Sequence, residues 1–318
     1  MKFFRTISLF FILFTLSGCS FSSKEPITKS GFYFDTVIQI TIYDSDSTNL
    51  IEQCFAYCED FEQLISRTKE GSDIYRINHA SGVPVEVSDT TIELLKAGIY
   101  YGELTNGAFD ITIAPLSELW DFKNNTKIPD DNAIASALSH VSYKNILIEG
   151  NKVSLKDPLA AIDLGGIAKG YIADRLKSYL EKEGVTSALI NLGGNILTIG
   201  AKPDGSAFQI GIQKPFDKKN TTITSASATD SSVVTSGSYE RYFETNGKIY
   251  HHILDTKTGY PCENNLLSVT ILSKDSISGD ALSTACFVLG LEDAKKLIDS
   301  LDDVEAIFIT NEFSVIST

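Results

Sequence analysis

The segment DLGGIAKGYIAD, residues 163–174, combines residue types that can bind an anionic ligand. Asp163 ends an apolar run, Gly165 and Gly166 follow, and Lys169 lies in the first turn of a helical pattern. A lysine is unfavourable there unless an anion lies nearby, because a helix N-terminus already carries partial positive charge. The two glycines would let a ligand approach the backbone, so the pattern indicates a phosphate-bearing ligand. The spacing is neither a GxGxxG fingerprint nor a P-loop, and a simple tight turn with Asp163 as a helix cap is the open alternative.

Asp280 and Thr284 lie four residues apart in a second helical segment, DALST. This spacing puts a carboxylate and a hydroxyl on one helix face. Hard oxygen ligands of this kind suit Mg²⁺, which keeps several waters and usually bridges to substrate phosphates. The alternative is structural, with the acid favoured by the helix dipole and the threonine packed in the core.

Two adjacent histidines, His251 and His252, precede Asp255 in the segment HHILD. Neighbouring side chains on a strand point to opposite faces, so at most one of the two enters a given site. Histidine is the natural proton carrier near neutral pH. Asp255 is spaced to orient an imidazole or to accept a proton itself, whereas zinc is disfavoured because no further His or Cys stands at ligand spacing.

The elements that must position these groups are strands and helices in irregular alternation. Hydrophobic periodicity predicts a strand over 34–43, a long helix over 50–65, a helix from Ser88 or Asp89 to about 106, and a hairpin over 145–155. The glycine segment begins a helix that ends near Gly184, and the polar stretch 218–230 is predicted to be a mobile excursion. Because strands mostly follow strands, we expect an α+β fold with a largely antiparallel or mixed sheet core and packed helices.

Residues 1–18 have the pattern of a bacterial signal peptide. Basic Lys2 and Arg5 precede an apolar run over 7–16, which is too short to span a bilayer because a spanning helix needs roughly 20 residues. The sequence Leu-Ser-Gly-Cys then resembles a lipobox, with cleavage before Cys19 and lipid on its sulfur. We therefore expect residues 19–30 to form a lipidated linker and 31–318 a single domain, anchored on the extracytoplasmic face of a bacterial membrane. A plain secretory signal is the alternative.

The formal net charge of −14 argues against a nucleic-acid partner, because such a surface repels nucleic acid and anionic lipid. Anionic ligands must then be bound by local groups. Beyond Cys19 the chain has Cys54, Cys58, Cys262 and Cys286. Exported proteins can form disulfides, but Cys54 and Cys58 share the apolar face of a predicted helix, which favours buried free thiols.

Seven ordered motifs resemble those of the ApbE family, FAD:protein FMN transferases. They cover nearly the whole chain from Gly31 to Val315 and read SRTKEGSDIYRIN, NGAFDITIAPLSELW, DLGGIAKGYIAD, INLGGNI, TSGSYERYF, HHILDTKTGYP and GDALSTACFVLG. Two positions depart from the family pattern. Phe34-Asp35-Thr36 stands where the family often has Met-Gly-Thr, and Thr256 replaces the proline that usually follows the aspartate of the histidine motif.

The resemblance implies a Mg²⁺-dependent enzyme that cleaves FAD and attaches FMN through a phosphoester to a threonine or serine of an acceptor flavoprotein, releasing AMP. His252 would take the proton of the acceptor hydroxyl, with Asp255 as its companion. The Gly166 carbonyl, Asp280 and Thr284 would hold Mg²⁺. The residues that the resemblance places at the FAD site are Phe34, Thr68, Asn78, Ala108, Phe109, Asp110, Asp163, Lys169 and Ile253.

The family also suggests the acceptors, which are flavin-carrying subunits of membrane redox complexes or exported flavoproteins with a short Ser/Thr-containing target motif. Two other functions are open. A Mg²⁺-dependent FAD pyrophosphatase would use the same site with water in place of the acceptor hydroxyl. A non-enzymatic flavin-binding lipoprotein is disfavoured by the Asp280/Thr284 pair and the histidine motif, since a passive receptor needs neither.

Overall fold

The structure is a computed structural model that describes residues 25–218 and 221–318. The predicted signal peptide and Cys19 lie outside these residues. Within the described ranges no helix is both long enough and apolar enough to span a membrane. The helices of this part of the chain are α1 (Thr48–Ile65), α2 (Asp73–Asn78), α3 (Asp89–Leu104), α4 (Ala114–Trp120), α5 (Asp131–Leu138), α6 (Ala168–Lys182), α7 (Ser276–Leu289) and α8 (Leu291–Ile298), with a 3₁₀ turn at Tyr143–Asn145.

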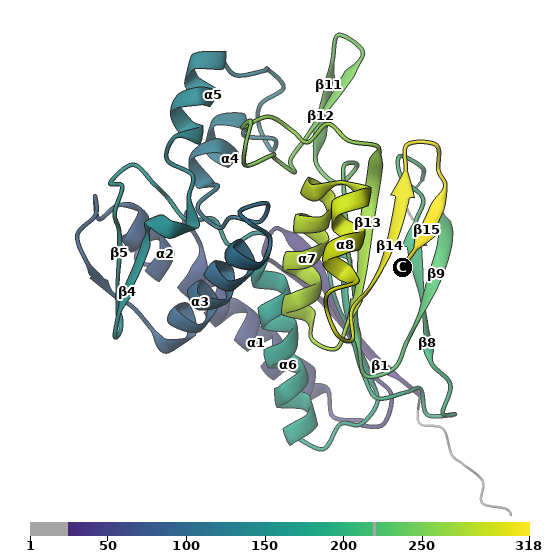
Figure 1. The fold of residues 1–318 in the computed structure, drawn as a ribbon. Coiled ribbons are helices and arrows are strands. Elements are labelled where there is room, and N and C mark those ends of the chain that lie inside the picture. The colour runs from purple at the N-terminus through teal and green to yellow at the C-terminus, as the bar shows by residue number, and fades with distance from the viewer. Residues whose placement is uncertain (1–24, 219–220) are drawn as a thin grey trace, which may run out of the picture.

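An eight-stranded sheet forms the centre of the fold (Figure 1). Its strand order is β1-β2-β6-β7-β10-β13-β14-β15, and every neighbouring pair is antiparallel. The predicted α+β class with a largely antiparallel sheet is therefore confirmed. The strands are β1 (Ile27–Tyr33), β2 (Thr36–Ile42), β6 (Ala188–Leu192), β7 (Asn195–Ile199), β10 (Ser232–Gly237), β13 (Leu266–Ser273), β14 (Glu305–Thr310) and β15 (Val315–Ser317).

Helices cover one face of this sheet, and a small hairpin covers part of the other. Helices α1, α6, α7 and α8 lie together on the first face (Figure 1), where the alternating isoleucines of β2 are fully buried. On the second face the hairpin β8–β9 packs apolar side chains against β10 and β14. The strands outside the main sheet are β3 (Val85–Glu86), β4 (Ile146–Glu149), β5 (Lys152–Leu155), β8 (Phe208–Gln213), β9 (Thr222–Ala228), β11 (Tyr242–Thr245) and β12 (Lys248–His251).

Helices α6 and α7 approach closely at Gly170. A Cβ atom there would lie 2.3 Å from the carbonyl oxygen of Ser276, so only glycine permits this distance. Asp174, one turn further along α6, accepts hydrogen bonds from the N–H groups of Ser276 and Ile277 at the start of α7. Burial raises the pKa of this carboxyl to about 6. The two helices that carry the DLGGIAK and DALST motifs are thus fixed to each other.

Several local predictions need correction. The strand predicted over 34–43 begins only at Thr36, because Phe34 and Asp35 form the β1–β2 turn with φ angles of 53° and 58°. Strand β1 begins at Ile27, within the stretch expected to be a linker, because residues 27–30 pair with β2. The polar segment 218–230 contains strand β9 instead of a mobile excursion, since its backbone pairs with β8. The division into signal, linker and domain otherwise stays a prediction.

Candidate active site

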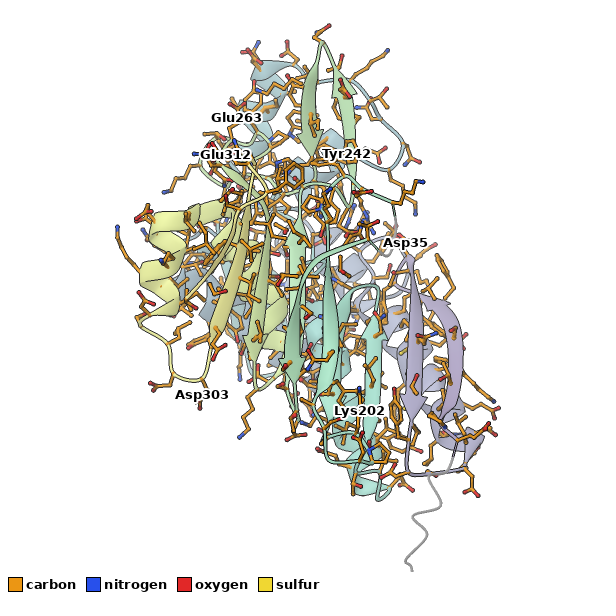
Figure 2. The ribbon with its side chains drawn as sticks, turned by 90° about the vertical axis from the view of Figure 1, so that its right-hand side faces the viewer. Asp35, Lys202, Tyr242, Glu263, Asp303 and Glu312 are labelled. Atoms are coloured by element: carbon orange, nitrogen blue, oxygen red, sulfur yellow. The ribbon has the colours of Figure 1, made fainter. Side chains whose placement is uncertain are left out.

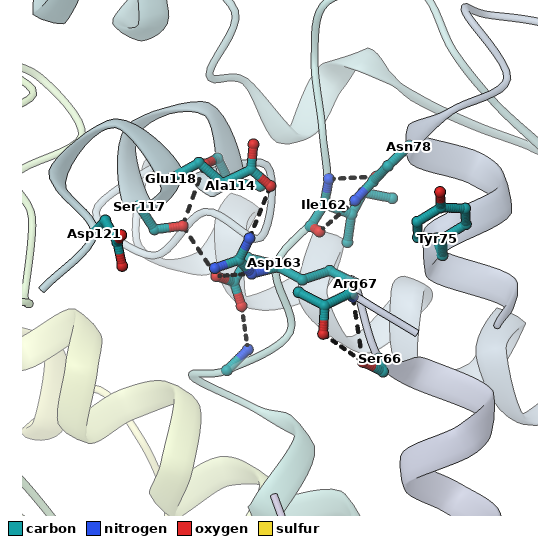
Figure 3. Close-up of polar contacts among 12 residues, drawn as sticks. Ser66, Arg67, Tyr75, Asn78, Ala114, Ser117, Glu118, Asp121, Ile162 and Asp163 are labelled. Carbon is teal, nitrogen blue, oxygen red and sulfur yellow. Dashed lines mark hydrogen bonds and ion pairs between the residues drawn. The ribbon is translucent and has the colours of Figure 1, made fainter. Parts of the chain in front are cut away.

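Asn78 fixes the backbone that leads into the glycine turn. Its Nδ2–H donates to the Ile162 carbonyl at 2.9 Å, and its Oδ1 accepts from the Ile162 N–H at 2.7 Å (Figure 3). Asn78 is the last residue of α2, a short helix capped by Ser72. Because both ends of the amide bind Ile162, Asn78 holds the turn, and its place at the FAD site stays a prediction.

Asp163 fixes the glycine turn and contacts two other elements. Its Oδ1 accepts from the Gly165 N–H at 2.9 Å, and its Oδ2 lies 3.0 Å from the Ser117 Oγ and 3.2 Å from the Arg67 Nε (Figure 3). Helix α6 begins at Ala168 without a side-chain cap. Asp163 therefore does not cap the helix, and the interpretation of this segment as only a capped tight turn is incomplete.

Lys169 and Asp280 form an ion pair between the two motifs. The Lys169 Nζ lies 3.4 Å from Asp280 Oδ1 and donates to the Gly165 carbonyl at 3.3 Å. The second oxygen of Asp280, a residue only 4% exposed, accepts from the Gly170 N–H at 2.9 Å. The anion that the sequence requires beside Lys169 is thus a carboxylate on α7, and the glycine at position 170 lets the backbone reach it.

Gly166 and Thr284 complete this cluster. A Cβ on Gly166 would lie 3.6 Å from the Thr284 Oγ1 and 3.1 Å from the ring of Phe109, so Gly166 lies close to both groups. The Thr284 hydroxyl also lies 3.2 Å from the Ser236 hydroxyl. The structure therefore brings together the three residues that the sequence assigned to a metal, Gly166, Asp280 and Thr284.

The chemistry of these donors fits Mg²⁺. Within residues 25–218 and 221–318 no group of three or more His, Cys, Asp or Glu side chains is placed to hold a metal ion. The cluster instead offers one carboxylate, one hydroxyl and one backbone carbonyl. Such a sparse set of hard oxygen donors suits an ion that keeps several waters and shares its coordination with phosphate, and it does not suit zinc.

The two histidines lie in different surroundings. His251 is buried against the ring of Phe287, with Nε2 3.1 Å from the Cys262 carbonyl and Nδ1 without a partner. Burial lowers its pKa to about 4. Its neighbour His252 has Nδ1 3.3 Å from the Arg241 carbonyl. An Nδ1–H facing a carbonyl leaves Nε2 with the free lone pair, which is the form a general base requires.

His252 is held in its neutral form. Burial lowers its pKa to about 3, and the positive charges of Arg241, His251 and Lys169 add to the effect. The positive charge of Lys169 thus acts on His252. This charge is an electrostatic connection between the histidine motif and the cluster of Gly166, Asp280 and Thr284. A bound anion beside Lys169 would offset this charge and make the imidazole more basic.

Asp255 does not orient the imidazole of His252 in this structure. Its Oδ1 accepts from the Lys257 N–H at 2.8 Å, and its backbone carbonyl accepts from the Gly259 N–H at 2.8 Å. These contacts close the turn that follows the histidines, as aspartate side chains commonly do. The structure thus gives Asp255 a role in shaping this turn, and its catalytic role stays a prediction.

The remaining residues predicted at the FAD site differ in their exposure and in their partners. Phe109 is buried and its ring touches the Gly166 position, whereas the Asp110 carboxylate is used by Thr112 and by the Tyr143 N–H. Burial raises the pKa of Asp110. Ala108 and Ile253 are buried, the Thr68 hydroxyl lies 3.2 Å from that of Ser66, and the Phe34 N–H donates to Glu62 Oε1 at 2.9 Å.

A groove of about 450 Å³ is lined in part by Arg241, the residue whose backbone carbonyl lies 3.3 Å from His252 Nδ1. It lies where the β1–β2 turn meets the start of β11, and Figure 2 shows Asp35 and Tyr242 at the same end of the sheet, opposite Lys202 and Asp303. Large aromatic side chains line it in exposed positions, since Phe32 is 68% and Tyr242 44% exposed. Its lining residues are Phe32, Asp35, Phe122, Lys123, Glu240, Arg241 and Tyr242.

Sequence reasoning did not single out three residues that shape the site, Arg67, Gly170 and Arg241. Gly170 follows Lys169 in the quoted motif, but its importance depends on the approach of α7, which no local pattern reports. Arg67 and Arg241 also lie within quoted motifs. Their partners are distant in sequence, so only the fold identifies them.

Comparison with known proteins places these motifs in one family. The model of the ApbE family matches residues 34–308. A FAD:protein FMN transferase of Klebsiella pneumoniae is 38% identical over 299 residues, covering 93% of this chain and 92% of the relative. One of Treponema pallidum is 30% identical over 320 residues, covering 94% and 88% of the two chains.

Solved structures agree with this assignment. The ApbE protein of Thermotoga maritima has a TM-score of 0.85 and 32% identity, covering 92% of this chain and 97% of its own. The flavin transferase ApbE of Vibrio cholerae has a TM-score of 0.80 and 28% identity, covering 92% and 96%. From its motifs, its fold and these relatives, the chain belongs to the ApbE family.

Proposed function

We propose that this chain transfers FMN from FAD to a threonine or serine hydroxyl of an acceptor flavoprotein, with Mg²⁺, and releases AMP. The names of its relatives support flavin transfer to protein. The observation that carries the proposal is the convergence of Lys169, Asp280 and Thr284 with Gly166. A passive flavin carrier would need neither this set of oxygen donors nor a histidine held in its neutral form.

In the proposed reaction the acceptor oxygen attacks the phosphorus of the FMN half of FAD. The new P–O bond forms as the bond to the bridging pyrophosphate oxygen breaks, and AMP leaves with that oxygen. His252 takes the hydroxyl proton at Nε2, the nitrogen left free by the contact of Nδ1 with the Arg241 carbonyl. Lys169 binds the pyrophosphate and offsets its charge, while the glycine turn brings backbone close to it.

Gly166, Asp280 and Thr284 would hold Mg²⁺, which would supply Lewis-acid stabilisation of charge on the phosphates. Asp280 is oriented for this by the Gly170 N–H, which binds only one of its two oxygens. The other oxygen faces Lys169, so metal and pyrophosphate would meet between α6 and α7.

The direct test is transfer of flavin to an acceptor flavoprotein that carries a short Ser/Thr-containing target motif. Incubation with FAD and Mg²⁺ should give a covalently bound fluorescent flavin on the acceptor in a denaturing gel. His252→Ala should bind FAD but lose transfer. If only free FMN and AMP appear, the chain is a FAD pyrophosphatase, and if FAD binds without turnover and without dependence on Mg²⁺, it is a flavin-binding lipoprotein.

The proposed location is the extracytoplasmic face of a bacterial membrane, with residues 1–18 removed and Cys19 lipidated. The lipobox pattern and the polar start of the mature chain support it. Acceptors would then be exported flavoproteins or subunits of membrane redox complexes. Fractionation of host cells tests the anchor, because Cys19→Ala should move the protein from the membrane to the soluble fraction, and an unchanged distribution would exclude lipid anchoring.

A further inference from the structure

Arg67 joins two carboxylates that belong to different parts of the chain. Its Nη1–H donates to Glu118 Oε1 at 2.7 Å, and its Nε lies 3.2 Å from Asp163 Oδ2 (Figure 3). Arg67 lies directly after α1, Glu118 on α4 and Asp163 at the glycine turn. The planar guanidinium has donors in a fixed fork, so it can bind both acceptors at once. The three segments are thereby held together at one edge of the site.

The contact with Asp163 is the better shielded half of this bridge. The side chains of Arg67 and Asp163 are 30% and 21% exposed, whereas that of Glu118 is 56% exposed. Exposed ion pairs are strongly screened by water, so the charge of Arg67 acts mainly on Asp163.

Asp163 and Lys169 meet at a single residue. The Gly165 N–H donates to Asp163 Oδ1, and the Gly165 carbonyl accepts from the Lys169 Nζ. Without the guanidinium, Asp163 would keep its hydrogen bonds from the Ser117 hydroxyl and the Gly165 N–H but would lose its ion-pair partner, next to the place where Lys169 receives a pyrophosphate. The negative charge would repel the substrate, and two hydrogen bonds alone would hold the carboxylate less firmly.

We propose that Arg67 is a positioning residue for FAD, which fixes the Asp163 carboxylate and offsets its charge so that the pyrophosphate can bind at Lys169. This inference rests on the proposed function and adds to it a residue with no assigned role. Within the described ranges, the side chain of Arg67 pairs with Glu118 and Asp163 and makes no hydrogen bond or ion pair with Asp280, Thr284 or His252. It therefore acts on FAD affinity and not on the transfer step.

The substitution Arg67→Gln, made in the full chain, tests this role. With Mg²⁺ present, the Kd for FAD, measured by flavin fluorescence, should rise about tenfold, as expected for a lost charge-assisted contact. The loss should be larger at low salt than at high salt because charge repulsion is screened. The kcat at saturating FAD should change by less than about twofold, because only ground-state binding is affected. Arg67→Lys should recover part of the affinity, since it keeps the charge but not the fork.

Lys177 provides a matched control on the same helix as Lys169. It also bridges two carboxylates, Asp230 at 2.6 Å and Glu181 at 3.7 Å, but it lies about two turns further along α6. Lys177→Gln removes one positive charge from a similar bridge outside the site, and FAD affinity should stay at the wild-type value. Thermal unfolding of each variant separates a lost contact from a lost fold.

The results separate this inference from the proposed function. A wild-type chain that neither binds FAD nor transfers FMN would overturn both. A wild-type chain that does both, with an Arg67→Gln variant of unchanged Kd, would overturn only the role of Arg67. A variant with unchanged Kd and reduced kcat would do the same, because that pattern belongs to a group acting in the transfer step.

Discussion

Lys169 pairs with Asp280 and is proposed to bind the pyrophosphate of FAD. It should therefore affect the binding of Mg²⁺ and the binding of FAD in opposite directions. Its ammonium lies 3.4 Å from Asp280, the one carboxylate of the predicted Mg²⁺ set. A metal ion at Asp280 must compete with Lys169, and a pyrophosphate must draw Lys169 away from Asp280. In the proposed reaction, Mg²⁺ and FAD would therefore assist each other, because each would release the partner that the other needs.

The substitution Lys169→Gln should consequently strengthen the binding of Mg²⁺ and weaken the binding of FAD. We expect Mg²⁺ to bind more tightly in the absence of FAD, because its competitor is gone. FAD should bind at least about tenfold more weakly, as the loss of a charged donor to phosphate implies. Separate calorimetric titrations with Mg²⁺ and with FAD measure both, and parallel weakening of the two would contradict the competition.

His251 makes the stability of the fold depend on pH. Burial lowers its pKa in the folded protein from 6.5 to about 4, so between these values the unfolded chain binds a proton that the folded chain does not. The free energy of unfolding therefore falls as pH falls through this window, by up to about 1.4 kcal/mol per pH unit. His252 shifts in the same direction.

The variant His251→Gln isolates the contribution of one imidazole, because His252 titrates equally in both proteins. Urea unfolding at pH 7 should show the variant to be less stable than the wild type. At pH 5 this difference should shrink by about 2 kcal/mol, since only the wild type carries the proton penalty at position 251. A difference that is equal at both pH values would show that His251 is not held neutral by the fold.

At the scale of elements, the site depends on short pieces of structure that lie outside the main sheet. Helix α2 is only six residues long, yet Asn78 at its end holds both backbone groups of Ile162. An isolated helix of this length is not stable in water, so its packing and the Ser72 cap must maintain it. The geometry of the glycine turn is thus set from 84 residues earlier in the chain.

Asn78→Ala should lower the free energy of unfolding by about 2–4 kcal/mol, because it leaves a buried N–H and a buried carbonyl unpaired. It should also weaken FAD binding, since the turn that follows loses its anchor. Chemical denaturation and flavin fluorescence measure the two effects. Asn124, an exposed residue whose amide donates to the Asp121 carboxylate, is the control, and its replacement by alanine should change both quantities little.

The sequence predicted the long elements better than the short ones. The periodicities over 50–65 and 145–155 and the Ser88 cap are confirmed, because each depends on local burial or local hydrogen bonds. Strand β9 was not predicted, because its polar, Ser/Thr-rich residues lack a clear hydrophobic alternation and the strand pairs only with β8. Helices α4 and α5 were not predicted, because a helix of seven or eight residues shows little hydrophobic periodicity.

The candidate site was predictable as a set of motifs but not as a set of contacts. The resemblance selected Gly166, Lys169, Asp280 and Thr284, and the fold does bring these residues together. It could not reveal that the Asp255 carboxylate turns toward Lys257, because an adjacent aspartate is equally suited to shaping a turn. It also could not reveal Arg67, whose value depends on partners more than 50 residues away along the chain.

At the scale of the whole molecule, one wall of the groove is formed by Arg241, whose backbone carbonyl lies 3.3 Å from the Nδ1 of the predicted base His252. Exposed Phe32 and Tyr242 are costly on a monomer surface unless they serve recognition. If the acceptor protein enters here, its contacts with these aromatic rings should determine how well it binds, and FAD should be unaffected.

The double variant Phe32→Ala, Tyr242→Ala should raise the KM for the acceptor about fivefold or more, as expected for the loss of exposed aromatic anchors. The Kd for FAD should stay constant. Tyr100→Ala removes an exposed aromatic ring from α3 and should leave both constants unchanged. Steady-state transfer kinetics at varied acceptor concentration measure the effect, and an unchanged KM would place acceptor binding elsewhere.

The four cysteines of the described chain are all free and buried, on α1, on α7 and at position 262. Burial raises the pKa of Cys54, Cys58 and Cys286 to about 12 and raises that of Cys262 as well. Since thiolates are the reactive form, alkylating reagents can modify these residues only when the surrounding structure opens. The rates at which the cysteines of α1 and α7 are alkylated would therefore measure how often each helix opens. Oxidation in an extracytoplasmic compartment would modify these cysteines only in chains that have already unfolded.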